Sequence, residues 1–219
     1  MQLRQRLLHL NIPYDSVKSY KPGILVLTLS AVQVMRMGFD PELGIDAYFL
    51  SKAATQDLSD QDDSAKAKSG TGKSKQGKPK QIIELETLEQ QIELFLNIPD
   101  GDMLLKESLY SLDESELLMT EMVRYWKKGD EVLMNKLLFE DALTEYPAFS
   151  DIYDDLFYQR NQQMVKKIDG MLSGRLEHKT QAQSQQRKSY FVVVGSGHMI
   201  GEKGIVNALK EKGYVVERL

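Results

Sequence analysis

Apolar residues recur at three- and four-residue spacing along most of this chain, the pattern of amphipathic helices that pack by one face. Residues 1–54 are expected to be helical, with Pro22 at a first helical position, Gly38 as a stop and a second short helix from about Leu43 to Ala54. The same spacing returns from residue 100 to residue 170. The chain is therefore predicted to carry a substantial layer of helices.

Three short segments rich in apolar residues have a different pattern and are predicted to be strands, and residues 190–194 among them form the unbroken apolar run typical of a buried strand. They cover residues 82–85, 190–194 and 214–219. Thr87 and Gln90 have the spacing of a capping box, which predicts that a helix begins directly after the first of these runs. The predicted fold class is α/β and helix-rich, with a small, mostly parallel sheet covered by many helices.

A polar stretch separates the two apolar parts of the chain. Residues 55–80 are rich in Ser, Asp, Lys, Gly and Gln and cannot repay the entropy cost of ordering, so we expect a disordered insertion there. Residues 1–54 are then the N-terminal helical part of one domain. Residues 81–219 complete that domain with the helical layer and a C-terminal strand-turn-helix-strand unit.

Composition and charge narrow the classes of function. A hydrophobic content of 42% over 219 residues allows a real core, and a formal net charge of −4 disfavours a nucleic-acid partner. The chain has no cysteine, so a bound metal would need imidazole and oxygen ligands. The most apolar stretch, Ile24–Met35, is shorter than the roughly 20 residues of a membrane span. No secretory signal is visible, so we expect a cytoplasmic protein unless an upstream signal directs export to the periplasm.

His198 is the first candidate for chemistry, because it ends a predicted strand inside a glycine-rich turn. Gly195 and Gly197 in this turn would permit close backbone approach or positive φ. Imidazole is both a metal ligand and an acid or base that titrates near neutral pH. A satisfied structural histidine is an equally open interpretation.

Arg160 and Asn161 lie on a predicted helix from about Ser150 to Leu172, and Arg160 falls on its apolar stripe. A buried guanidinium needs carboxylate, carbonyl or phosphate partners, although a structural arginine that reaches water is the alternative. Glu86 follows the first predicted strand. In a parallel sheet Glu86 and His198 would emerge at the same carboxyl edge, where Arg160 could reach both.

Three acidic residues have a simpler interpretation as helix-end charges. Glu86 would be favoured by the dipole of the helix that follows it, and this alternative weighs about as much as a catalytic role. Asp46 and Glu202 are expected in the first turns of their helices. Capping therefore stays the preferred interpretation for Asp46 and Glu202.

Four ordered blocks of the sequence resemble the TraB/GumN family, which is similar to the animal Tiki proteases. The blocks are Gly38–Asp46, Ile83–Thr87 with Gln91, Gln159–Asn161 and Phe191–Gly201. The resemblance implies an α/β domain related to erythromycin esterase and ChaN-like folds, with a site of two Gly-x-x-His motifs, a glutamate and an arginine. Gly195-Ser-Gly-His198 corresponds to the second motif, and the first is not found in these 219 residues.

The resemblance implies a peptidase that depends on a divalent metal such as manganese, cobalt or zinc. His198 would bind the metal, Arg160 would stabilise developing negative charge, and Glu86 would be a ligand or general base. Asn161 is predicted to be a third catalytic residue with Glu86 and Arg160. The alternative is a non-catalytic module that binds or sequesters a peptide or protein. A membrane-associated regulator is a third and weaker hypothesis. The oligomeric state is left open by the sequence.

Overall fold

The structure is a computed structural model that describes residues 2–54, 80–111, 114–175 and 189–219. The described chain divides into two compact units, residues 38–84 on the one hand and residues 1–37 with 85–219 on the other, and each is considered by itself. Among the described residues no helix is long and apolar enough to cross a membrane.

The unit of residues 38–84 is built from two short helical elements, the 3-10 turn η1 (Pro41–Leu43) and helix α4 (Ile45–Ala54). Gly38 ends the preceding helix with a φ of +89°, a conformation that favours glycine. Asp40 caps η1 by accepting a hydrogen bond of 2.9 Å from the backbone N–H of Glu42. The predicted disordered insertion lies almost entirely outside the described residues, which stop at 54 and resume at 80.

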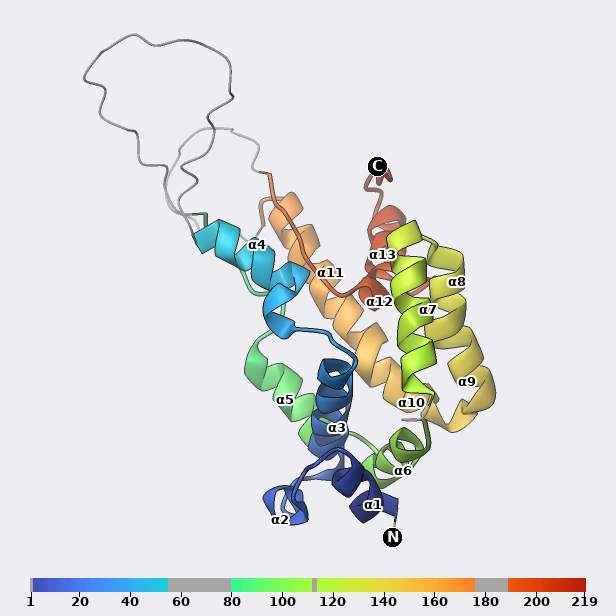
Figure 1. Cartoon of the computed structure of the whole chain (residues 1–219). Coiled ribbons are helices and arrows are strands. Elements are labelled where there is room, and N and C mark those ends of the chain that lie inside the picture. Colours follow the sequence, from blue (N-terminus) through green and yellow to red (C-terminus); the bar gives the residue numbers. More distant parts are fainter. Residues whose placement is uncertain (1, 55–79, 112–113, 176–188) are drawn as a thin grey trace, which may run out of the picture. The chain divides into compact units, whose positions relative to one another are not determined.

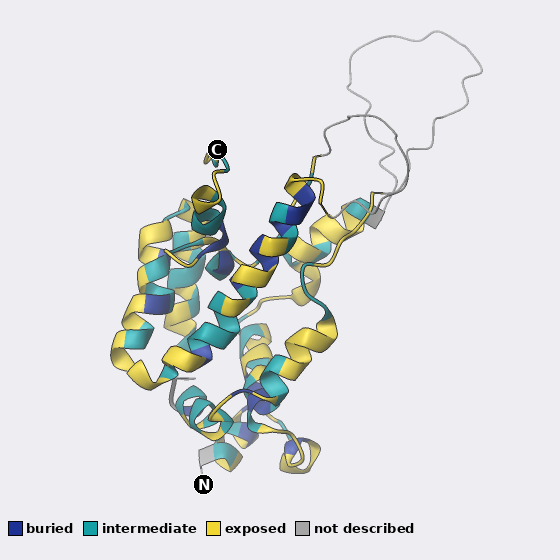
Figure 2. Cartoon of the chain, turned by 180° about the vertical axis from the view of Figure 1, so that it is seen from behind, coloured by how far each residue is buried: buried dark blue, intermediate teal, exposed yellow. Residues whose placement is uncertain are grey.

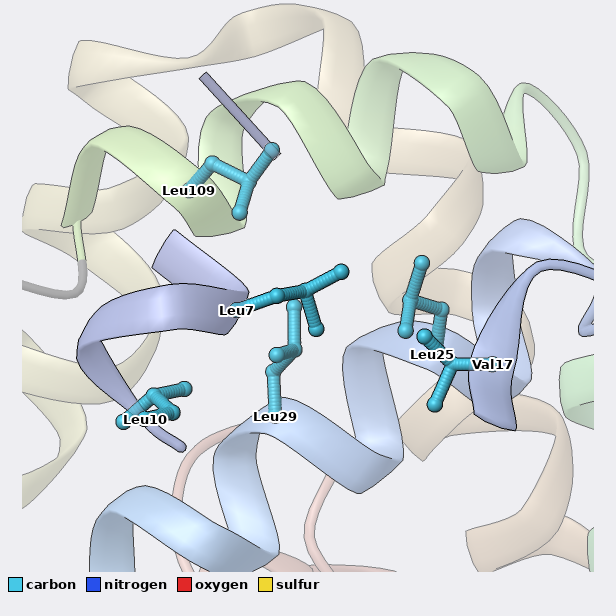
Figure 3. Packing of buried hydrophobic residues seen from close by; sticks show 6 residues of the cluster. All are labelled: Leu7, Leu10, Val17, Leu25, Leu29 and Leu109. Carbon is cyan, nitrogen blue, oxygen red and sulfur yellow. The ribbon is translucent and has the colours of Figure 1, made fainter. Parts of the chain in front are cut away.

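The larger unit begins with a helical subassembly. Its helices are α1 (Gln2–His9), α2 (Tyr14–Val17), α3 (Pro22–Arg36), α5 (Leu88–Leu96) and α6 (Gly101–Ser111). Helix α3 packs against α5 and α6, and Pro22 occupies its first turn as predicted. The buried side chains between these helices come from α1, α2, α3 and α6 (Figure 3) and are Leu7, Leu10, Val17, Leu25, Leu29 and Leu109.

The rest of the larger unit contains two long helices that each include a π-helical segment. After α7 (Ser115–Lys128), the first runs through α8 (Glu131–Asn135), η2 (Lys136–Glu140) and α9 (Asp141–Glu145). A 3-10 turn, η3 (Pro147–Phe149), leads to the second, made of α10 (Ser150–Tyr153), η4 (Asp154–Tyr158) and α11 (Gln159–Leu172). Single π turns inside helices are frequent at functional sites.

A second apolar core forms around α11, which runs beside α12 (Ser196–Met199) and α13 (Ile205–Glu211) in Figure 1. Its buried side chains are Met164, Val165, Ile168, Met171 and Ile205. Leu85, Tyr190 and Val194 pack against this cluster from the flanking extended chain. Figure 2 shows buried positions recurring along one side of α11, as the predicted apolar stripe requires.

The predicted α/β fold class is wrong, because the described residues contain helices and no β-strand. The three apolar runs at residues 82–85, 190–194 and 214–219 are not strands in the part of the chain that the structure describes. Val194 packs on α11 by its side chain, whereas Phe191 is 73% exposed. A strand needs a second strand to pair with, and an apolar run of five residues does not specify one.

Candidate functional site

Glu86 and Arg160 form a two-point ion pair that joins residues 74 positions apart in the sequence. Arg160 Nε donates to Glu86 Oε1 at 2.8 Å, and Arg160 Nη2 donates to Glu86 Oε2 at 2.7 Å. The Glu86 side chain is 8% exposed and the Arg160 side chain 21%. The predicted meeting of these two residues is confirmed, although Glu86 lies in the bend before α5 and not at the end of a strand.

Local structure fixes both members of this pair. Glu86 precedes Thr87, which caps α5 in the predicted capping box: Thr87 accepts a bond of 3.2 Å from the Gln90 N–H and donates its own N–H to Gln90 Oε1 at 2.9 Å. Arg160 is the second residue of α11, directly after the π segment η4. Its Nη1 donates to the backbone carbonyl of Leu156 at 2.8 Å. Three of the five guanidinium N–H groups are thereby used.

Asn161 and His198 form a second, more buried pair beside the first, with 3% and 8% of their surfaces exposed. Asn161 Nδ2 donates to the backbone carbonyl of Lys203 at 2.8 Å, and Asn161 Oδ1 lies 2.7 Å from His198 Nδ1. Nε2 of His198 makes no hydrogen bond with any described residue. Since no fully buried side-chain nitrogen of the described residues lacks a partner, Nε2 is not fully buried.

The turn that carries His198 depends on close packing at Gly197. A Cβ atom there would lie 3.1 Å from Cε1 of Phe157, the ring that also faces the imidazole at a centroid distance of 5.5 Å. Gly195 is different, because a Cβ atom would meet only His198 Cδ2 at an ordinary 3.7 Å. Neither glycine has positive φ, whereas Gly201 has a φ of +78°. The expected close approach therefore holds for Gly197, and positive φ belongs to Gly201 instead.

The electrostatic surroundings favour a neutral imidazole and an ionised carboxylate. Burial lowers the pKa of His198, and the nearby Arg160 charge lowers it further, while Glu86 acts in the opposite direction. The hydrogen bond from Arg160 holds the pKa of Glu86 below its usual value against the effect of burial, and a hydrogen bond from Gln91 adds to this. At neutral pH the site therefore presents an uncharged histidine beside a closed ion pair.

Two predicted site residues lie elsewhere. Asp46 is in the first turn of α4, within the unit of residues 38–84, as the capping interpretation expects. Glu202 is exposed and precedes α13, which begins at Ile205, so its placement in a first helical turn is wrong. Its backbone carbonyl accepts a hydrogen bond of 2.8 Å from Asn207 Nδ2.

Sequence reasoning missed two contributors, Phe157 and the backbone carbonyl of Lys203. Phe157 is one of several apolar residues of its helix and carries no distinctive sequence signal, yet its ring packs against the His198 imidazole. No sequence pattern marks the carbonyl of Lys203, since a backbone acceptor is independent of residue type. The glycines at 201 and 204 around it were the available signal.

The described residues do not by themselves fit a divalent metal. They contain no group of three or more histidine, aspartate and glutamate residues placed to hold one ion. Nε2 of His198 is available as a ligand, but both carboxylate oxygens of Glu86 are held by Arg160. The positive guanidinium would also oppose a cation at this carboxylate.

A family comparison identifies the class of protein to which this site belongs. The model of the TraB/PrgY/gumN family matches residues 73–218, a stretch that includes Glu86, Arg160, Asn161 and His198. The chain belongs to the TraB/PrgY/gumN family.

Individual relatives agree with this assignment. The chain is 29% identical over 188 residues to "Uncharacterized protein YbaP" of Escherichia coli, covering 85% of this chain and 55% of that protein. It is 35% identical over 68 residues to the "Metalloprotease TIKI homolog" of Amphimedon queenslandica, covering 31% of this chain and 11% of that protein. It is 24% identical over 114 residues to "Metalloprotease TIKI2" of Xenopus tropicalis, covering 44% and 19%.

The chain spans about half the length of the YbaP protein that it matches, and a much smaller share of the metalloproteases. No solved structure matches it significantly.

Proposed function

We propose that this chain carries part of a peptide-hydrolysing site in which Nε2 of His198 is the reactive atom. The observation that carries the proposal is a buried imidazole whose Nδ1 is engaged by Asn161 and whose Nε2 is not fully buried and makes no hydrogen bond with a described residue. A nitrogen presented in this way can accept a proton from water or bind a divalent ion. Relatives named as metalloproteases favour peptide substrates and a bound metal ion.

In this proposal the ion pair beside His198 serves to bind and orient the substrate. Arg160 keeps two N–H donors after its bonds to Glu86 and Leu156, and these can hold a carbonyl or carboxylate oxygen of a peptide. Glu86 has both oxygens committed to Arg160, so it acts by fixing the guanidinium. Asn161 orients the imidazole.

A metal supplies Lewis acidity and a lower pKa for bound water wherever one is held. Since the described residues offer one free imidazole nitrogen, any ion at this site needs ligands beyond them. Whether peptide hydrolysis depends on added metal is therefore decided by experiment.

The test is peptide hydrolysis by protein stripped with chelator and then supplied with manganese, cobalt or zinc. His198→Ala should abolish turnover, whereas His9→Ala, which changes an exposed histidine of α1, should leave turnover unchanged. Absence of turnover under all metal conditions, or turnover that survives His198→Ala, would contradict the proposal.

The second candidate function is peptide or protein binding without catalysis. It is favoured by the exposed apolar side chains of Phe191 and Val192, which lie on extended chain that leads directly to the His198 turn. Extended segments with exposed apolar groups suit binding of another extended chain. Peptide titration under excess chelator separates the two candidates, since affinity without any metal-dependent turnover would support binding alone.

A further inference from the structure

We infer that Asn161 is a positioning residue that holds His198 in the tautomer with the proton on Nδ1. The backbone carbonyl of Lys203 determines which end of the Asn161 amide faces the histidine. The inference deepens the proposed function and rests on it for its meaning in catalysis. Its evidence is a hydrogen-bond chain of three groups, of which two are buried side chains.

The direction of the chain follows from which groups can donate. A backbone carbonyl only accepts, so the Asn161 atom 2.8 Å from the oxygen of Lys203 must be the amide nitrogen. The amide oxygen therefore faces His198, and it too can only accept. At 2.7 Å from that oxygen, His198 Nδ1 must carry a hydrogen. In the neutral ring the lone pair then resides on Nε2.

The opposite tautomer is disfavoured by the same geometry. It would place the lone pair of Nδ1 against the lone pair of Asn161 Oδ1 at 2.7 Å, with both atoms withdrawn from water. Turning the amide over would not relieve this, because its oxygen would then face the carbonyl of Lys203. Each flip leaves two acceptors in contact, which carries the cost of an unsatisfied buried polar group.

The position of the Lys203 carbonyl is fixed by the loop around it, in which two glycines pack closely against other residues. Gly201 has a φ of +78°, and a Cβ atom there would collide with Asn135. A Cβ atom at Gly204 would collide with the backbone of Ile200. The Lys203 ammonium lies over the ring of Tyr158, 4.0 Å from its centroid, which ties the loop to the π segment η4.

The neutral His198 ring therefore carries its proton on Nδ1, whereas the neutral side chain of histidine in water prefers the proton on Nε2. Here Nε2 is kept unprotonated and is not fully buried, so it can accept a proton or bind a cation. Metal-binding histidines are typically held in this way, with the other ring nitrogen hydrogen-bonded to a group that fixes the tautomer and the orientation of the ring.

The experiment is nitrogen-15 NMR of the histidine rings in the substrate-free protein, at alkaline pH where imidazole is neutral. The wild-type chain should show His198 with a pyrrole-like Nδ1 and a pyridine-like Nε2. Asn161→Ala should shift His198 towards the Nε2–H tautomer. Asn161→Asp should retain the Nδ1–H tautomer, because one carboxylate oxygen still accepts from Nδ1, but the variant should be less stable since the other oxygen cannot donate to the Lys203 carbonyl.

The control is Asn97→Ala, which changes an exposed asparagine at the end of α5 and should leave the His198 signals unmoved. A pyridine-like Nδ1 in the wild-type chain would overturn the inference, and that measurement needs no variant to fold. An unchanged tautomer in folded Asn161→Ala would also overturn it. Since no peptide is present, failure of this test is distinct from failure of the hydrolase proposal, which is decided by turnover.

Discussion

Breaking the Glu86–Arg160 pair should destabilise the larger unit substantially. The pair has two hydrogen bonds of 2.8 and 2.7 Å, and the carboxylate side chain is only 8% exposed. Removing one member of a buried ion pair costs roughly 3 to 5 kcal/mol, because the other charge stays desolvated. Arg160 is 21% exposed and can turn partly to water, so Glu86→Gln should cost about 2 to 3 kcal/mol.

Arg160→Met leaves the more deeply buried charge alone and should cost about 3 kcal/mol or more. The double variant removes both charges and keeps an apolar group of similar length against Leu156. Its cost should be smaller than the sum of the two single costs by about 1 to 3 kcal/mol, which is the coupling expected for residues in one network.

The assay is urea unfolding followed by circular dichroism, with the free energies compared at equal denaturant slopes. Asp15→Asn is the matched control, since it breaks a 2.9 Å pair with Lys18 in which both side chains are exposed, and it should cost less than about 1 kcal/mol. Single variants within about 0.5 kcal/mol of wild type, or strictly additive effects, would refute the argument that this pair holds α5 to α11.

Three further outcomes follow from the same region. The Glu86 carboxyl has a lowered pKa in the folded state, so its contribution to stability should be present above the ordinary glutamate pKa and lost as pH falls through the lowered pKa. Glu86→Gln should therefore reduce the fall of the urea unfolding midpoint at acidic pH. The His198 ring, titrated by proton NMR, should show a midpoint below 6.5, and a midpoint above it would contradict the effect of burial. Gly197→Ala should destabilise by about 1 kcal/mol against Phe157, while Gly195→Ala should be near neutral by thermal unfolding.

The helices and their ends could be predicted from the sequence because their signals are local. Pro22 at the start of α3, the positive φ of Gly38 after it and the capping box at Thr87 are each decided within a few residues. The sheet could not be predicted in this way. An apolar run such as residues 190–194 shows that a segment tends to avoid water, and the packing of Val194 on the core around α11 satisfies part of that tendency without a β-sheet among the described residues.

The pairing of Arg160 with an acidic residue could be predicted for a reason that does not depend on fold class. Arg160 falls on the apolar stripe of α11, and a guanidinium placed there requires an acid whatever elements surround it. The structure supplies Glu86. What the sequence could not indicate was the role of Lys203, because the part that matters is its backbone carbonyl. The assignment of Asn161 and Glu86 as catalytic residues stays a prediction, and the geometry favours positioning roles for both.

Arg160 and Asn161 show how one helix can organise two separate networks. Adjacent residues of a helix point about 100° apart. Arg160 therefore faces the start of α5, where it binds Glu86, while Asn161 faces the loop that carries His198 and Lys203. Because both begin from the first turn of α11, a substitution at residue 160 should act mainly through the α5 side and one at residue 161 through the imidazole. Both hydrogen-bond networks therefore start from neighbouring residues of one helix, and placing site residues on a regular element is what a preorganised site requires.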